Sequence, residues 1–250
     1  MATDSHDLQS QDATSVAAAG AGGFAPSERT PPLESGDRLT RAEFERRWEL
    51  TPELRFAELL EGIVFLQAPI SHAHGKPHGL IATWAGMYAA MTTGVEMIVE
   101  PSVRMGDENM PQPDALLRIA SEQVGHSKLT GDGYLEGGPE LVAEIAASSA
   151  SRDMHVKREI YRAHGVQEYL VWRVYDREID WFELRDGQYE PLPQDADGLV
   201  RSRVFPGLWL DRAAMLVGDG ARVVTQLQLG MASAERAGFV ARLAASALRQ

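Results

Sequence analysis

The sequence contains no cysteine in its 250 residues. This absence excludes a disulfide scaffold, a zinc site with cysteine ligands, an iron–sulfur cluster and a thiol nucleophile. Long hydrophobic runs are also missing, because the longest apolar stretch, residues 80–91, is interrupted by Thr83 and is too short to cross a bilayer. Asp4 and Asp7 stand where an export signal needs positive charge. We therefore expect a cytoplasmic protein.

Positive charge is scarce, with 24 basic residues against 36 acidic residues and a net charge of −12. This balance argues against a protein that coats nucleic acid by charge alone, although it leaves room for an enzyme with one local groove. Lysine is especially rare: Lys76, Lys128 and Lys157 are the only three, and the other 21 basic residues are arginines. A lysine in such a chain raises the question of whether a compact ammonium group is required at that position.

The composition divides the chain into three parts. Residues 1–37 are rich in small and polar residues without apolar periodicity, which predicts a disordered tail. We expect one domain over residues 38–215 and a helical extension over residues 216–250.

Helical and strand patterns alternate along the predicted domain. Helices are expected from Thr40, over about residues 77–93 with Pro77 in the first turn, and over residues 152–164. A hairpin is expected over residues 57–67 and a long loop or hairpin over 120–140. Strands are expected over 95–105, 115–119, 141–147, 168–175 and 178–184, and a strand or extended piece over 203–210. This order predicts an α/β or α+β domain with a mixed central sheet flanked by helices.

Two acidic residues stand in apolar surroundings. Asp114 precedes a predicted core strand, and Glu144 lies inside another. Buried carboxylates need a partner, and a divalent cation bound through oxygen atoms would let two of them lie close together. Asp153, Lys157 and Tyr161 follow at i, i+4 and i+8, so they share one helix face from which Lys157 could approach Glu144.

A plainer interpretation remains open at this point. Glu144 could face solvent from a half-exposed sheet. Asp153 and Lys157 could form an ordinary surface pair worth about 0.3 kcal/mol.

Five segments in order resemble the Uma-type putative restriction endonuclease family, within the PD-(D/E)XK nuclease superfamily. They are AELLEG at residues 57–62, QPD at 112–114, PELVAE at 139–144, the Asp153–Lys157–Tyr161 series, and GVQEYLVW at 165–172. The resemblance covers roughly residues 38–215.

The resemblance implies a restriction-endonuclease-like fold and metal-dependent cleavage of phosphodiester bonds. Asp114 and Glu144 match the metal-binding acids, Lys157 matches the catalytic lysine, and Glu58 matches the acidic residue of the first core element. The superfamily pattern places its lysine two residues after the glutamate, where this chain has Ala146; in this family the lysine is typically displaced to the following helix. Ala147 stands where a serine often begins the next loop.

Other chemistry-bearing residues carry weaker signals. His72, His74 and His78 lack a zinc-site spacing, so structural or DNA-backbone roles are favoured over metal binding, with His74 near the mouth of the active site. Four tryptophans are expected in the core, and three arginines either contact phosphate or form a solvated helix face. These residues are Trp84, Trp172, Trp181 and Trp209, and Arg152, Arg158 and Arg162.

The sequence thus predicts an endonuclease that acts on DNA with Mg²⁺, or with Mn²⁺, and that works as a homodimer if it cuts both strands. Asp114 and Glu144 would hold the metal, Lys157 would assist the attacking water, and Glu58 would bind a second metal or orient the helix–sheet junction. The alternative is a catalytically inactive module that binds nucleic acid or a protein partner. Metal binding separates the two hypotheses.

Overall fold

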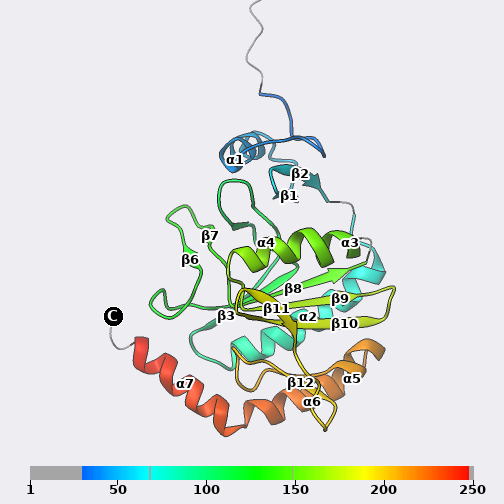
Figure 1. Ribbon diagram of the computed structural model, residues 1–250, viewed down its shortest axis with the longest axis vertical. Helices are drawn as coiled ribbons and strands as arrows, with labels where there is room; N and C mark the ends of the chain where they lie inside the picture. Colours follow the sequence, from blue (N-terminus) through cyan, green and yellow to red (C-terminus); the bar gives the residue numbers. More distant parts are fainter. Residues whose placement is uncertain (1–29, 68, 148, 248–250) are drawn as a thin grey trace, which may run out of the picture. The chain divides into compact units, whose positions relative to one another are not determined.

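Helices and strands follow one another in the predicted alternating order (Figure 1). The computed structural model describes residues 30–67, 69–147 and 149–247. The helices are α1 (Arg41–Glu49), α2 (His72–Ala90), α3 (Ala150–Arg152), the π-helical turn η1 (Asp153–Lys157), α4 (Arg158–Ala163), α5 (Arg212–Val217), α6 (Gly220–Met231) and α7 (Ala234–Ala247). The strands are β1 (Ala57–Leu60), β2 (Ile63–Leu66), β3 (Val95–Val99), β4 (Val103–Arg104), β5 (Ala115–Ile119), β6 (Lys128–Leu129), β7 (Leu135–Glu136), β8 (Leu141–Ala146), β9 (Glu168–Arg173), β10 (Glu178–Arg185), β11 (Gln188–Pro191), β12 (Leu199–Arg201) and β13 (Trp209–Asp211).

The central sheet has six strands in the order β11-β10-β9-β8-β5-β3. Within it, β8 and β9 run parallel and every other neighbouring pair is antiparallel, which confirms the predicted mixed sheet. Strand β8 is buried along its whole length because both faces of the sheet are covered.

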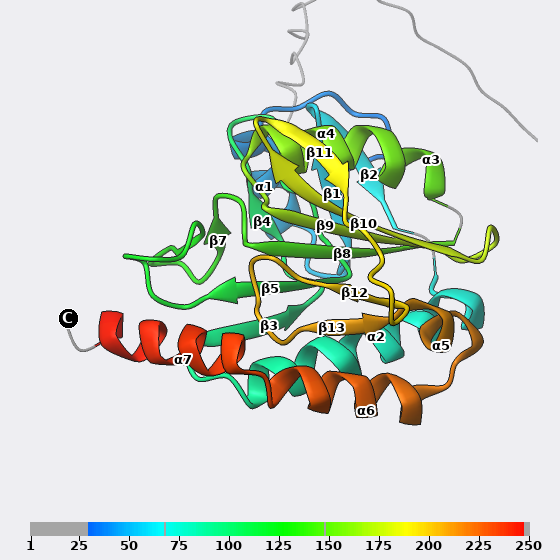
Figure 2. The same cartoon turned by 60° about the horizontal axis from the view of Figure 1, so that its bottom comes forward.

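Helices cover both faces of the sheet (Figure 2). Helix α4 lies over one face, and α2 lies with the C-terminal helices over the other. Side chains of β8 alternate between the faces, so Val142 and Ala146 pack on the α4 side while Leu141, Ala143 and Ile145 pack on the α2 side. Glu144 belongs to the first set by this alternation, and it therefore points toward α4.

The larger core lies on the α2 side and contains three of the four tryptophans predicted to be buried. Trp84, Trp172 and Trp181 are buried, whereas Trp209 is half-buried. The indole N–H of Trp84 donates to the backbone oxygen of Trp209 at 2.9 Å, which satisfies the polar atom of a fully buried ring.

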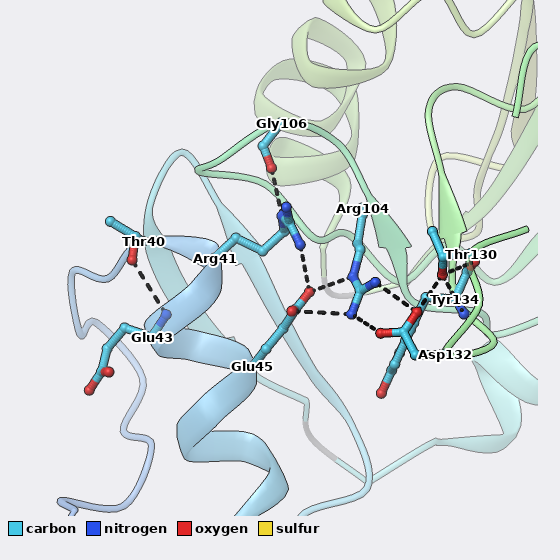
Figure 3. Close-up of polar contacts among 9 residues, drawn as sticks. All are labelled: Thr40, Arg41, Glu43, Glu45, Arg104, Gly106, Thr130, Asp132 and Tyr134. Atoms are coloured by element: carbon cyan, nitrogen blue, oxygen red, sulfur yellow. Dashed lines mark hydrogen bonds and ion pairs between the residues drawn. The ribbon is translucent and has the colours of Figure 1, made fainter. Parts of the chain in front are cut away.

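Helix α1 is joined to a second, three-stranded sheet, in the order β4-β7-β6, by an ion-pair network centred on Arg104 of β4 (Figure 3). The Arg104 guanidinium donates to Glu45 at 2.7 and 3.2 Å and to Asp132 at 3.0 and 2.7 Å. It also lies 4.5 Å above the Tyr134 ring, and Arg41 adds a second contact to Glu45 at 2.9 Å. Forked geometry of this kind gives arginine–carboxylate pairs their directionality.

The β1–β2 hairpin turns at Glu61 and Gly62, as predicted. Both residues have positive φ values, 51° and 73°, as a tight two-residue hairpin turn requires. In this register Glu58 pairs with Phe65, and Glu58 itself is buried.

The boundaries of the predicted parts differ from the structure at both ends. The packed unit begins at Pro32 rather than at Arg38, because Leu33 is buried beside Phe44 and the Gly36 N–H donates to Val64. Residues 1–29 of the predicted tail lie outside the described residues. At the other end, α6 and α7 contribute Leu227 and Phe239 to the larger core, so the predicted extension packs on the domain.

Several predicted elements differ from the structure in their extent, among them the strand over 95–105, which is divided into β3 and β4. Helix α2 begins at His72, since the Ser71 side chain caps the His74 N–H, and Pro77 lies inside the helix rather than in its first turn. Of the strand or extended piece predicted over 203–210, only the end forms a strand, β13, because the preceding residues turn toward Glu168 and bond to its carboxylate. Among the helices of the described residues, none is long and apolar enough to cross a membrane.

Candidate active site

A cavity of about 620 Å³ opens between the β1–β2 hairpin, the start of α2, the central sheet and the η1 turn. Its volume is typical of sites that hold a small ligand or part of a larger one. The charged groups that line it are the carboxylates of Glu58, Glu100, Asp114, Glu144 and Asp153 and the cations of Arg152 and Lys157.

The ammonium group of Lys157 lies at the centre of this acidic set. Its Nζ is 2.6 Å from Glu58 Oε1 and 3.0 Å from Glu144 Oε1, while Asp153 Oδ1 is 3.9 Å away. Lys157 is only 3% exposed, and Glu58 and Glu144 are equally buried. Burial lowers the pKa of Lys157, but the attraction of Glu144 and Glu58 outweighs it and raises the pKa above its ordinary value. Lys157 therefore remains a cation.

The local backbone explains how Lys157 reaches the sheet. The η1 turn places both Asp153 and Lys157 in the interior, and Tyr161 follows on the buried side of α4. The Tyr169 hydroxyl donates to the Asp153 backbone oxygen at 2.9 Å, which anchors the turn to β9. Tyr161 donates to Glu144 Oε1 at 2.6 Å, so the same oxygen receives both the tyrosine and the lysine.

Asp114 is brought to Glu144 by the pairing of β5 with β8. Ala115 pairs with Ala143, and one further step of this antiparallel register sets Asp114 opposite Glu144. The Ile145 N–H donates to Asp114 Oδ2 at 2.6 Å and fixes the carboxylate at the strand junction.

The other oxygen of Asp114 meets an imidazole from helix α2. His74 Nε2 lies 3.1 Å from Asp114 Oδ1. Burial raises the pKa of Asp114, but the hydrogen bond and charge of His74 outweigh it, so the net shift is downward. The same hydrogen bond raises the pKa of His74.

Glu144 is the carboxyl group that the site destabilises most as an anion. Burial raises its pKa well above the ordinary value; Lys157 opposes this shift, whereas Asp153, Asp114 and Glu58 add to it. The single positive charge of Lys157 therefore does not neutralise all the carboxylates that surround it.

The donor set fits a divalent cation. Asp114 and Glu144 offer carboxylate oxygens, which are the ligands that Mg²⁺ prefers. Two buried oxygens on the cavity wall, Gln112 Oε1 and Asp153 Oδ1, have no hydrogen-bond partner among the described residues. Extra positive charge would offset the repulsion between the carboxylates and let Glu144 remain ionised.

All four predicted site residues line this one cavity. The plainer interpretation is wrong in two respects, because Glu144 does not face solvent and the Asp153–Lys157 pair is buried rather than on the surface. His74 lies in the cavity wall as expected, but His72 does not line it. Arg152 lines the cavity, whereas Arg158 stacks over Phe182 and Arg162 pairs with Glu159.

Two members of the site were not predicted. Gln112 donates its backbone N–H to Glu58 Oε1 at 2.9 Å and so helps to position that carboxylate. Its neighbour Asp114 was predicted, but nothing in the sequence marks a backbone amide as a partner. Glu100 lies within residues 95–105, which were predicted as a strand, but nothing in the sequence marked its carboxylate as part of a site, and only the fold brings it to the cavity.

Comparisons with known proteins bear on this arrangement. A family model described as "Uma2: Putative restriction endonuclease" matches residues 41–213. A crystal structure of a putative nuclease of the DUF820 group from Anabaena variabilis ATCC 29413 is similar with a TM-score of 0.56 and 16% identity, over 72% of this chain and 98% of that chain. At this identity the likeness shows a shared fold alone. No curated protein matches the sequence. Since the family model spans more than half of the sequence, the chain belongs to the Uma2 family of putative restriction endonucleases.

Proposed function

We propose that this protein is a metal-dependent endonuclease that hydrolyses phosphodiester bonds of DNA. The observation that carries the proposal is the charged Lys157, held between Glu58 and Glu144 in the acidic cavity. Membership of the family supports the reaction class.

Asp114 and Glu144 would hold the divalent cation, with Mg²⁺ as the first choice and Mn²⁺ as an alternative. When bound, such an ion supplies Lewis-acid polarisation of the phosphate and lowers the pKa of a water molecule. Tyr161 supports this role from the protein side, because its hydroxyl orients the Glu144 carboxylate at 2.6 Å.

Lys157 would act as a fixed positive charge rather than as a base. An ammonium group has three N–H donors, and Glu58 and Glu144 accept two of them at hydrogen-bond distance. Asp153 at 3.9 Å is too far to accept the third. That donor would orient the attacking water or stabilise charge on the phosphate in the transition state.

Glu58 would act through Lys157. Its Oε1 accepts from both the lysine and the backbone N–H of Gln112, so it ties the η1 turn to the segment that leads into Asp114. This contact favours the orienting role over a second metal site for Glu58.

The DNA would enter from the side of the cavity that Arg152 lines. Its guanidinium lies 5.0 Å from the Phe65 ring, which leaves a planar cation at the wall for contact with a phosphate. The chain as a whole is acidic, so binding depends on this local group and on the cation rather than on overall charge. The described part of the chain forms one such site, and we expect double-strand cleavage to require a homodimer.

The test is cleavage of supercoiled plasmid by the purified chain with Mg²⁺, with Mn²⁺ and with a chelator. We expect nicking that requires the metal and falls about 100-fold or more in Lys157→Met, which removes a preorganised charge. The matched control is Lys128→Met, because Lys128 is exposed on β6 and lines no part of the cavity. Equal activity in the two variants would refute the role of Lys157. No metal-dependent cleavage under any condition would favour the inactive binding module.

A further inference from the structure

Helix α2 carries two histidines on the face that meets Asp114. His74 and His78 are spaced i, i+4, so their rings project from the same side of the helix. The ring centroids lie 5.7 Å apart, and one ligand atom from each of His74, His78 and Asp114 lies within 4.8 Å of the other two.

The contact between His74 and Asp114 already has the geometry of two ligands of one ion. His74 Nε2 and Asp114 Oδ1 are 3.1 Å apart. Neighbouring ligands of a transition metal lie about 3.0–3.4 Å apart when each is about 2.1 Å from the ion.

The tautomer of His78 is fixed by the backbone. His78 Nε2 lies 2.9 Å from the backbone oxygen of Asp114, and since a carbonyl only accepts, Nε2 must donate. The neutral ring then has its lone pair on Nδ1. Metal-binding histidines are commonly oriented in this way, with the second ring nitrogen bonded to a backbone carbonyl.

An oxygen of a fourth residue lies near that lone pair. Glu100 Oε1 is 4.0 Å from His78 Nδ1, so in the neutral state two acceptors are close together with no hydrogen bond between them. Glu100 has a φ of 51° and donates its N–H to the Asp114 oxygen at 3.1 Å, which holds its side chain at this position despite the left-handed backbone.

We propose that His74, His78 and Asp114 bind a first-row transition-metal dication, with Glu100 beside it. Two imidazoles and a carboxylate favour Mn²⁺, Co²⁺ or Zn²⁺ over Mg²⁺, which prefers oxygen ligands. The inference goes beyond the proposed cleavage reaction, because it concerns ion binding and is measured without DNA. Asp114 would be common to this site and to the pair with Glu144, and a carboxylate has enough lone pairs for two cations.

The experiment is a Co²⁺ titration of the full-length, untagged chain, followed by visible absorption in the presence of excess Mg²⁺. We expect ligand-field bands and an affinity that falls at least about tenfold in His74→Asn and in His78→Asn, as loss of even an outer partner does. His72→Asn is the matched control, because His72 belongs to the same helix but is exposed and outside the cluster. Glu144→Gln should retain Co²⁺ binding.

Several results would overturn the proposal. These are the absence of ligand-field bands, displacement of Co²⁺ by Mg²⁺, or unchanged affinity in both histidine variants. If a variant fails to fold by circular dichroism, pulsed electron paramagnetic resonance of Mn²⁺ bound to the unmodified chain decides the matter, since coordinated imidazole nitrogen gives a hyperfine signal and its absence refutes the site. Metal-dependent cleavage without this signal would leave the proposed nuclease function standing and remove only the histidine site.

Discussion

Replacing Glu168 with glutamine should change how the stability of the domain depends on pH. Glu168 is fully buried at the start of β9, where its carboxyl group accepts from the Ser202 hydroxyl at 2.8 Å and from the backbone N–H groups of Arg203 and Val204 at 2.6 and 3.1 Å. Burial raises its pKa from 4.5 to about 7, although these three hydrogen bonds act in the opposite direction.

The sign of the effect follows from proton binding. Between pH 4.5 and about 7 the folded state holds a proton at Glu168 that the unfolded chain has lost, so stability falls as the pH rises through this interval. The difference between 7 and 4.5 corresponds to about 3 kcal/mol at about 1.36 kcal/mol for each pKa unit. Any water that enters the site when Glu168 ionises reduces this difference.

Glu168→Gln mimics the protonated carboxyl group. The amide oxygen accepts the two backbone N–H groups, and the amide nitrogen donates to Ser202. We therefore expect the variant to resemble the unmodified protein near pH 5 and to gain stability relative to it as the pH rises to 8, by up to about 3 kcal/mol.

The assay is urea unfolding at several pH values, followed by the fluorescence of the five tryptophans. The raised pKa of His74 also makes the stability depend on pH, so the difference in unfolding free energy between the two proteins is the quantity to plot. Glu122→Gln, at an exposed carboxylate, controls for loss of one negative charge. A difference that stays flat within about 0.5 kcal/mol from pH 5 to 8 would show that the hydrogen bonds fully offset burial at Glu168.

Three further outcomes are expected. Lys157→Arg should lower the cleavage rate at least about tenfold and the unfolding free energy by about 1–3 kcal/mol, because a larger planar cation must fit a fully buried position; full activity would refute this. Arg104→Met should lower the free energy of unfolding by about 1 kcal/mol at low ionic strength and by less in added salt, as measured by urea unfolding. A loss of stability that does not depend on salt would show that packing, rather than charge, accounts for the effect. Leu33→Ala should lower the free energy of unfolding by about 2–5 kcal/mol, because Leu33 is 5% exposed and packs beside Phe44. An unchanged thermal midpoint would show that the Leu33 side chain does not stabilise the fold.

The parts of the fold that the sequence predicted best are those with local signals. The helix start at Thr40, the turn at Glu61 and Gly62 and the apolar run of β8 each depend on signals within a few residues, and each forms as expected. The helix start at His72 was missed because Pro77 is a strong first-turn signal, and the weaker cap at Ser71 decided the outcome.

The candidate site was predictable where a residue contradicted its surroundings. Glu144 is a carboxylate in an apolar strand, and Lys157 is one of three lysines among many arginines. The inclusion of Glu58 in the site came from the resemblance alone, and its contact with Lys157 was not predicted, because the hairpin and the η1 turn are about 100 residues apart in sequence and no periodicity links them. The contact between His74 and Asp114 is also non-local. The sequence therefore showed the histidine cluster but did not show that Asp114 is its partner.

The π-helical turn at Asp153–Lys157 has a consequence for changes in chain length. A turn of this kind accommodates one residue more than an α-helical turn, and each residue added to or removed from a helix rotates everything beyond it by about 100°. A single-residue deletion between Ala150 and Asp153 would therefore carry Lys157 away from Glu144 while leaving every side chain of the segment chemically intact. A substitution changes one side chain, whereas an insertion or deletion here moves Lys157, Tyr161 and the start of α4 together. In relatives that differ in the length of this segment, the lysine should occupy a different position in a sequence alignment. Aligning these relatives by helical phase rather than by residue identity will show which of them retain the same cation in the cavity.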